Sequence, residues 1–135
     1  MRLALLLLLL ASSQAALAAD GCKDHRVFKI EGVDQDLCFV ESSGSWVSRA
    51  CVEQTGAGSC EAQALLKKAP QVARLSEKER QGGKNPGSVL CAKLNGTVAY
   101  AKLESGSEIT FCEASDHSVV DCNALHQAWS SRHRR

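Results

Sequence analysis

Two cysteines and two histidines near the C-terminal end have residue types and spacing that could hold a zinc ion. They are Cys112, His117, Cys122 and His126, and the last two lie one helical turn apart in a helix. Thiolate and imidazole are ligands that tetrahedral zinc prefers. A disulfide between Cys112 and Cys122 would consume both sulfur atoms, and exported chains normally oxidise their cysteines. The sequence therefore predicts neither a bound metal nor another cofactor.

The tripeptide Asp116-His117-Ser118 contains the residue types of a nucleophile, a base and an orienting carboxylate. Nucleophilic catalysis needs these groups to meet through hydrogen bonds, and immediate neighbours on one loop seldom do so. The sequence has no Gly-x-Ser-x-Gly elbow, no Cys-x-x-Cys pair, no phosphate-binding glycine loop and no setting for paired carboxylates. We therefore expect a solvated polar loop there, no catalytic residues and a non-enzymatic protein.

The first residues of the chain, 1–18, have the three parts of a secretory signal peptide. Met1-Arg2 is a short basic start, residues 3–10 form an unbroken apolar run, and Ala16-Leu17-Ala18 supplies the small residues that a signal peptidase reads. A membrane-spanning helix needs about 20 apolar residues, and polar residues interrupt this segment too early. We expect cleavage after Ala18, export to the periplasm or the medium, and no transmembrane segment in the mature chain.

A lipid anchor on Cys22 is the alternative fate of the new N-terminal region. It would remove one cysteine and leave an even number. An acidic residue, Asp20, stands two places before Cys22 and fits a lipoprotein signal poorly. Because stable anchoring requires such signals to be present, the sequence favours an unmodified Cys22.

All seven cysteines follow the expected cleavage site: Cys22, Cys38, Cys51, Cys60, Cys91, Cys112 and Cys122. In an oxidising compartment their default fate is disulfides, and an odd number leaves one over. Only three Phe, two Trp and one Tyr are available to fill a core. We therefore expect disulfides, which stabilise by about 2–4 kcal/mol each, to supply part of the stability.

The charge balance gives no general case for nucleic acid as a partner. The whole chain has a formal charge of +1, and removing Arg2 with the leader leaves the mature chain neutral. A neutral protein lacks the electrostatic footprint of a nucleic-acid binder. The local exception is the tail Arg132-His133-Arg134-Arg135, which we interpret as a solvated terminus, with a weak contact to an anionic surface as the alternative.

Residues 19–70 form the first of two expected cysteine-rich segments. The runs 27–31 and 37–41 predict a β-hairpin with residues 32–36 as its turn, and a third strand is expected over 46–52. Residues 60–69 have apolar positions at helical spacing, with Ser59 as the N-cap and Pro70 as the stop. The segment therefore reads as a hairpin followed by a helix.

A polar stretch, residues 71–84, follows this helix and contains Gly82-Gly83. Such composition is typical of a linker or an exposed helix. We therefore place the boundary between the two segments there, with the second segment covering 85–135.

The second segment has signals for two helices and another hairpin. Asn85-Pro86 predicts the start of a short helix that Asn95-Gly96 ends, and the runs 97–103 and 108–111 predict a hairpin. Asp121 can cap a final helix with Ala124, Leu125, Ala128 and Trp129 on one face. The predicted fold class is α+β, with short helices packed on antiparallel hairpins.

Both segments end with a strand, a cysteine, a loop, a cysteine and a helix, and the two cysteine spacings differ by one residue. This echo indicates two related half-repeats, with convergence of two short disulfide hairpins as the alternative. If the echo is real, the pairs are Cys51–Cys60 and Cys112–Cys122. Among the remaining cysteines, Cys22 and Cys38 can pair across the first hairpin, although spacing does not prove a connectivity.

The C-terminal half combines one specific motif with a wider spacing pattern. The motif is Asn85-Pro86-x-Ser88-x-x-Cys91, and it is followed by Gly96, a hairpin, Cys112 and then Cys122 at the start of a helix. This order resembles a small cysteine-rich domain of exported bacterial proteins that carry a haemolysin label. The resemblance implies an exported or lipid-anchored envelope protein whose molecular activity is unassigned.

The chain departs from this family in two places. The family usually carries a fourth cysteine near the end of the last helix, where this chain has Ser130-Ser131-Arg132. Its tryptophan also lies nearer the third cysteine than Trp129 lies to Cys122. The missing cysteine puts the family's pairing for Cys91 in doubt, so we expect Cys91 to be the free or inter-chain thiol.

Small size, disulfide density and neutral charge favour an exported binding protein of the envelope or secretome, with an unknown protein or envelope component as its partner. A secreted inhibitor of a protease or other enzyme is the alternative. Its basis is that stiffened loops at 56–59 and 115–121 could present a rigid segment to a partner's cleft. Thiol chemistry through an unpaired Cys91 is a third hypothesis.

Overall fold

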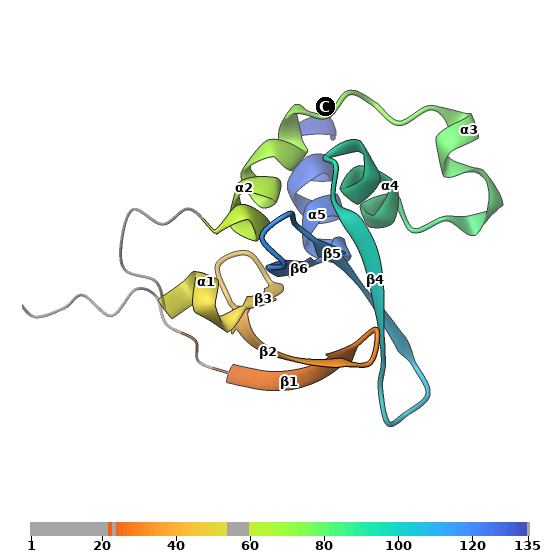
Figure 1. The fold of residues 1–135 in the computed structure, drawn as a ribbon. Helices are drawn as coiled ribbons and strands as arrows, with labels where there is room; N and C mark the ends of the chain where they lie inside the picture. Colours follow the sequence, from red (N-terminus) through yellow and green to blue (C-terminus); the bar gives the residue numbers. More distant parts are fainter. Residues whose placement is uncertain (1–21, 23, 54–59, 135) are drawn as a thin grey trace, which may run out of the picture.

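The computed structural model describes residues 22, 24–53 and 60–134 (Figure 1). The predicted signal peptide, its cleavage site and the loop at 56–59 lie outside these residues. The helix predicted over 60–69 has Cys60 at its N-cap position and not Ser59, because its first helical residue is Glu61. No helix in the described part of the chain has the length and apolar character needed to cross a bilayer.

Six antiparallel strands close into a barrel in the order β1-β2-β3-β6-β5-β4. The strands are β1 (Asp24–Ile30), β2 (Val33–Val40), β3 (Ser45–Ser48), β4 (Thr97–Lys102), β5 (Glu108–Glu113) and β6 (Val119–Asp121). Three consecutive strands come from residues 19–70 and three from 85–135, so one barrel contains strands of both expected segments. An origin of the two halves by duplication stays a prediction.

Two long-range seams close the barrel. Val47 of β3 pairs with Val120 of β6, and Ile30 of β1 pairs with Ala101 of β4. Next to the second seam, the Glu31 N–H donates to the Tyr100 carbonyl, and the Tyr100 N–H donates to Glu31 Oε1, both at 3.0 Å. Glu31 thus extends the β1–β4 seam through its backbone and its side chain.

Most of the helices gather on one side of the barrel, whereas the first, Arg49–Glu53, lies beside the β1–β2 hairpin (Figure 1). The helices are α1 (Arg49–Glu53), α2 (Glu61–Lys68), α3 (Glu77–Arg80), α4 (Pro86–Lys93) and α5 (Cys122–His133), with 3-10 turns at Ala69–Gln71 and Gln81–Gly83. The observed fold class is therefore α+β, as the sequence predicts, and its antiparallel hairpins belong to a closed barrel.

The buried side chains form two clusters. One lies inside the barrel and contains Phe28, Ile30, Leu37, Ala99, Ala101, Phe111 and Val119. The other lies between the barrel and the helices and includes Val47, Leu65, Leu90, Cys112, Val120 and Leu125. Successive side chains of a strand point to opposite faces, so neighbours such as Phe111 and Cys112 belong to different clusters. Strand β6 and the Phe111-Cys112 part of β5 are therefore buried on both faces.

The first hairpin is present, but its turn is shorter than predicted. Ile30 pairs with Val33, so the turn is Glu31-Gly32 and residues 33–36 belong to β2. Both turn residues have positive φ, 49° and 81°. Two-residue turns of this kind match the twist of paired strands, which explains why the polar residues after Gly32 continue the ladder.

The third strand ends earlier than the predicted range of 46–52. Arg49 begins α1, and its Nε donates to Glu53 Oε1 one turn later at 2.5 Å. Such a pair stabilises a short helix. Strand β6 was not predicted, because three residues are too few to show an alternating pattern.

The predicted helix starts of α4 and α5 are confirmed. Asn85 Oδ1 accepts from the Gly87 N–H, and Asp121 Oδ1 accepts from the Asn123 N–H, each at 2.8 Å. Asn95 takes the left-handed conformation after α4, with φ of 63°. These local signals worked because each depends on one or two residues and their own backbone.

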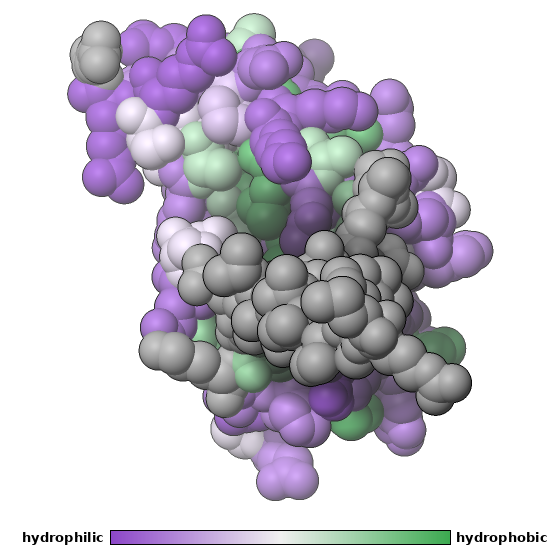
Figure 2. All heavy atoms as spheres, turned by 90° about the vertical axis from the view of Figure 1, so that its left-hand side faces the viewer, coloured by the Kyte–Doolittle hydropathy of each residue, from purple (hydrophilic) through white to green (hydrophobic). Residues whose placement is uncertain are grey.

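The surface beyond these clusters is mainly hydrophilic. On the face turned to the viewer in Figure 2, most of the described surface is polar, and hydrophobic side chains are visible in the upper middle and at the lower right. Among the described residues, the large apolar side chains that stay exposed are Val27, Val33 and Tyr100. Tyr100 is of interest because it borders a groove.

Candidate functional site

A groove of about 600 Å³ lies between helix α4, the outer face of strands β4 and β5, and the segment around α3. Its floor is formed by Val98 and Tyr100 of β4 and by Thr110 of β5. Tyr100 and Thr110 are direct partners in the β4–β5 register, so they lie side by side on the same face. Tyr100 is 46% exposed and presents its ring to solvent.

Helix α4 forms one wall of the groove, with Asn85, Ser88, Val89 and Ala92 lining it. The opposite side of α4 is buried, because Leu90 and Cys91 pack against the barrel. A Cys91–Cys112 disulfide, with Cα atoms 5.6 Å apart, links α4 to β5. The wall and the floor are therefore covalently joined.

The segment around α3 forms the remaining edge through Glu79, Gly83 and Lys84. Ser76 caps α3 by accepting from the Glu79 N–H at 3.2 Å, and Glu79 Oε2 accepts from the Ser76 N–H at 2.7 Å. This capping box fixes the helix start. Glu79 Oε1 also pairs with Lys93 Nζ of α4 at 2.5 Å. A salt bridge therefore connects α3 to α4 beside the groove.

Of the two charged residues that line the groove, Glu79 is in an ion pair and Lys84 is not, among the described residues. The hydrogen bond from Lys93 and that from the Ser76 backbone lower the pKa of the Glu79 carboxyl to about 2. Its negative charge is thus present at all ordinary pH values and is compensated by Lys93. Lys84, by contrast, is exposed and forms no ion pair with a described residue. The uncompensated charge at the groove is therefore positive.

Two of the expected disulfides are found in the structure. Cys22 is bonded to Cys38 across the first hairpin, and Cys51 of α1 is bonded to Cys60 at the start of α2. Both are within the first segment.

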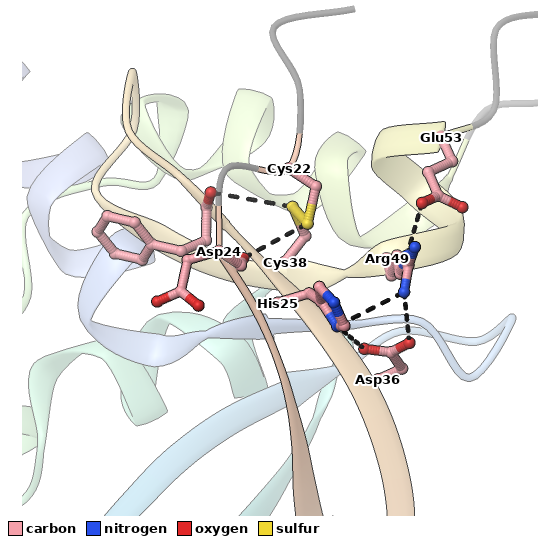
Figure 3. The surroundings of a disulfide bond; sticks show 8 residues. Cys22, Asp24, His25, Asp36, Cys38, Arg49 and Glu53 are labelled. Atoms are coloured by element: carbon pink, nitrogen blue, oxygen red, sulfur yellow. Dashed lines mark hydrogen bonds and ion pairs between the residues drawn. A yellow bond between two sulfur atoms is a disulfide. The ribbon is translucent and has the colours of Figure 1, made fainter.

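Polar residues surround the Cys22–Cys38 bond (Figure 3). Arg49 Nη1 lies 3.2 Å from Asp36 Oδ2, and His25 Nδ1 lies 3.5 Å from Asp36 Oδ1 (Figure 3). These side chains are partly exposed, so the network is a surface tie between the first hairpin and α1.

The expected Cys112–Cys122 bond and the free Cys91 are wrong. Cys91 pairs with Cys112, and Cys122 is the free cysteine of the described chain. The reason is the position of α4. Val120 is the partner of Cys112 in the β5–β6 register, and the side chain of Cys112 points out of the barrel to the side that α4 covers. Cys91 lies on the buried side of α4, with its Cα 5.6 Å from that of Cys112, and is therefore the cysteine bonded to it.

The four residues with zinc-like spacing are not assembled into a metal site. Cys112 is in a disulfide, Cys122 is buried, and His117 is exposed with Nδ1 3.0 Å from Glu113 Oε1. His126 lies on α5 with its ring centroid 6.0 Å from that of Trp129. Across residues 22, 24–53 and 60–134, no three His, Cys, Asp or Glu side chains could hold one metal ion.

The loop with Asp116-His117-Ser118 contacts the start of α2. Asp116 Oδ2 accepts from the Glu61 N–H at 3.2 Å, and Ser118 Oγ accepts from the Ala62 N–H at 2.9 Å. His117 pairs with Glu113 and not with Ser118. The loop therefore caps a helix, while its tip at residues 115–117 stays exposed, and its use as the inhibitory segment of an enzyme inhibitor stays a prediction. The other loop considered for inhibition, 56–59, lies outside the described residues.

The sequence analysis places the groove residues in a predicted helix, a predicted hairpin and the polar linker, but it does not predict that they form one site. A signal for one part was available, since Ser76-x-x-Glu79 has the spacing of a capping box. The closeness of α3 to the floor of the groove on β4 has no such signal. It depends on the ion pair that joins Glu79 of α3 to Lys93 of α4. Distant contacts of this kind leave no local pattern.

Comparison with known proteins adds no relative to this description: no family model, curated protein or solved structure matches the chain. The resemblance to a haemolysin-labelled domain therefore stays an expectation.

Proposed function

We propose that the mature chain is an exported, non-enzymatic binding protein whose ligand lies in the groove beside α4. The observation that carries the proposal is the groove itself, with an apolar and aromatic lining, polar groups at its edge and an exposed cation, Lys84. The ligand that fits this lining is a small amphipathic molecule with a hydrophobic body and an anionic group.

Export is supported by the covalent chemistry of the fold. Three disulfides in a small protein are typical of the periplasm or the extracellular space, where thiols oxidise. The sequence of residues 1–18 has the pattern of a signal peptide. Together these features favour a secreted or periplasmic protein.

The dimensions and lining of the groove support ligand binding. Small-molecule sites typically have volumes of about 300–1,000 Å³ and a mainly apolar lining with a few polar groups. The groove has Val89, Ala92, Val98 and Tyr100 as its apolar part. Because the Cys91–Cys112 bond holds α4 on β5, little ordering is needed when a ligand enters, which favours affinity.

The titratable groups near the groove support binding in preference to catalysis. A general base works best with a pKa near the working pH, whereas the pKa of Glu79 is about 2. A nucleophilic cysteine needs a thiolate, whereas burial raises the pKa of Cys122 to about 12. Neither group is suited to chemistry near neutral pH.

The proposal is tested with two single-chain amphiphiles of equal length, decanoate and decylammonium, followed by NMR of the Val89 and Val98 methyl groups. We expect decanoate to bind about two- to fivefold more tightly, because an exposed ion pair contributes about 0.5–1 kcal/mol. Lys84→Gln should remove this preference. Lys67→Gln, on the exposed part of α2, is the matched control and should keep it.

A second variant tests the place of binding. Ala92→Trp adds a bulky side chain to an exposed position of the groove wall and should weaken decanoate binding at least about tenfold. Unchanged binding in A92W would show that the ligand lies elsewhere. Turnover of a substrate that A92W abolishes would show that the groove is catalytic and would overturn the non-enzymatic part of the proposal.

A further inference from the structure

The C-terminal end of α5 lies beside the segment that follows α2 (Figure 1). A second pocket, of about 300 Å³, lies between them. Its charged lining consists of Arg74, Arg80, Arg134 and His133, and its base includes Trp129 and Leu75. We call it the Trp129 pocket. It is separate from the groove, which has no lining residue in common with it.

The base of the Trp129 pocket is held in place by shared contacts. Trp129 Nε1–H donates to the Val72 carbonyl oxygen at 3.1 Å, and His133 Nε2 lies 3.1 Å from the same oxygen. The two rings also contact each other, with centroids 4.8 Å apart. Leu75 is buried below the pocket. The α5 helix and the segment 72–75 therefore form one fixed platform.

No ion pair among the described residues compensates the charge on this platform. The lining contains three guanidinium groups and no carboxylate. The ion pairs within the described residues join other cations, such as Lys29, Arg49 and Lys93, to their acids, and none joins Arg74, Arg80 or Arg134. In a chain with a formal charge of only +1, three arginines around one hollow are a local concentration of positive charge.

We propose that the Trp129 pocket binds a tetrahedral oxyanion group, such as a phosphate or sulfate ester, with the indole of Trp129 beneath the organic part of the ligand. The guanidinium group offers paired N–H donors that match two oxygens of such an anion. Arginines from two separate segments and a fixed aromatic base give the anion a defined position. This site goes beyond the groove proposed above, because it selects for charge and geometry and not for an apolar body.

The test uses sodium phosphate, with sodium chloride at equal ionic strength as the reference. The chain has two tryptophans, and both indole N–H signals can be followed by NMR. We expect the Trp129 signal to shift with phosphate to saturation while the Trp46 signal stays in place. Trp46 is a suitable internal control, because Arg26 lies 5.5 Å from its ring and would report non-specific attraction of anions to an exposed arginine.

Two kinds of arginine variant distinguish the effect of the positive charge on phosphate binding from the effect of the paired N–H donors. Arg74→Gln and Arg80→Gln should each weaken phosphate binding about three- to tenfold, since each removes a charge-assisted contact at a partly exposed site. The matched control Arg26→Gln should leave it unchanged. Arg74→Lys and Arg80→Lys should each retain only part of the affinity, because an ammonium lacks the paired donors.

The source of the anion is distinguished in two arms that use the full mature chain. One arm uses inorganic phosphate, and the other uses vesicles of phosphatidylcholine with and without phosphatidic acid. Shifts of Trp129 in the first arm alone identify a soluble ligand, and shifts in the second arm that R74Q weakens identify a lipid headgroup. The absence of a saturable Trp129 shift in both arms, or equal affinity in R74Q, R80Q and the unaltered chain, would overturn the proposal.

Discussion

Cys122 is the free cysteine of the described chain, and its surroundings keep it a thiol. Its side chain is buried, burial raises its pKa to about 12, and the charge of Asp121 acts in the same direction. A hydrogen bond with Ser88 opposes these effects only in part. Because thiolates and not thiols react with alkylating agents and disulfides, Cys122 should be inert in the native state.

Thiol labelling checks this expectation. Native, non-reduced protein should take up no iodoacetamide at pH 8, and the same protein in denaturant without reductant should gain one label, located at Cys122 by peptide mass. Label at Cys91 would instead contradict the Cys91–Cys112 bond. Rapid label in the native state would show that the α4–α5 contact opens readily.

Asp121 caps α5 although it is buried, and burial raises its pKa. Asp121→Ala should reduce the free energy of unfolding by about 1 kcal/mol, because the Asn123 N–H loses its acceptor. Asp121→Asn retains an acceptor and should cost less. These differences can be measured by urea unfolding at pH 7, and equal losses in both variants would show that the cap bond contributes little.

The contribution of Asp121 to the free energy of unfolding changes with pH in the direction opposite to that of a salt-bridged acid. The folded state holds the proton more tightly than the unfolded state, so the contribution of Asp121 is most favourable at low pH and declines as pH rises above about 3.8. Relative to D121N, the unaltered protein should therefore lose stability over this range.

At the scale of elements, the contact between the starts of α4 and α5 limits what the chain can place at Gly87. A Cβ atom at this position would lie 1.9 Å from the Cys122 carbonyl oxygen. The two helices approach so closely only because Gly87 has no side chain.

Gly87→Ala separates packing from helix propensity. Propensity alone predicts that alanine stabilises a helix by about 1 kcal/mol. We expect the reverse, a loss of about 1–3 kcal/mol in urea unfolding, because α4 must move away from α5. A stabilised G87A variant would show that the helices are further apart than described.

The α3 segment is held over the groove by the Glu79–Lys93 pair and the Ser76 capping box. The pKa of Glu79 is below its ordinary value of 4.5, so its contribution is complete above that value and is lost as pH falls to about 2. Hydrogen exchange of the Ser76 amide should accelerate relative to other amides over this acidic range. Glu79→Gln should exchange faster already at pH 6, and a rate unchanged by the variant would contradict the tie.

These elements also show which parts of the structure the sequence can predict. Asn85 and Asp121 are helix caps that act within two residues, so their positions were predictable from local chemistry. The barrel was not, because its closure depends on contacts such as Ile30 with Ala101 and Val47 with Val120, which join residues far apart in the chain. The groove depends in turn on that closure, which places Tyr100 beside α4.

For the whole molecule, the disulfides lie within the two cysteine-rich segments, 19–70 and 85–135, whereas strand pairing joins the segments to each other. Each disulfide joins cysteines of the same segment, whereas the β1–β4 and β3–β6 seams join the two segments. The contact of the 115–118 loop with α2 joins them again. The two segments are therefore connected by one backbone link and by non-covalent contacts.

A specific protease site inserted between Gly82 and Gly83 tests this arrangement. After cleavage, the two fragments should co-elute in native gel filtration and separate in urea without reductant, because no disulfide among the described residues crosses the cut. The matched control has the same insertion after Gly106, in the β4–β5 turn. Its fragments should stay together in urea until reduced, because Cys91–Cys112 spans that position. Fragments of the first variant that separate under native conditions would indicate two independent domains.

Under the proposed export, the pairing of the cysteines also bears on how the chain matures as it emerges from the membrane with its N-terminus first. Each bond joins two cysteines that are consecutive in the sequence, Cys22 with Cys38, Cys51 with Cys60 and Cys91 with Cys112. An oxidant that joins cysteines in the order of their emergence thus reaches the native set without reshuffling. Cys122 emerges last, when every earlier sulfur already has a partner, and is then enclosed by the closing barrel and its helices.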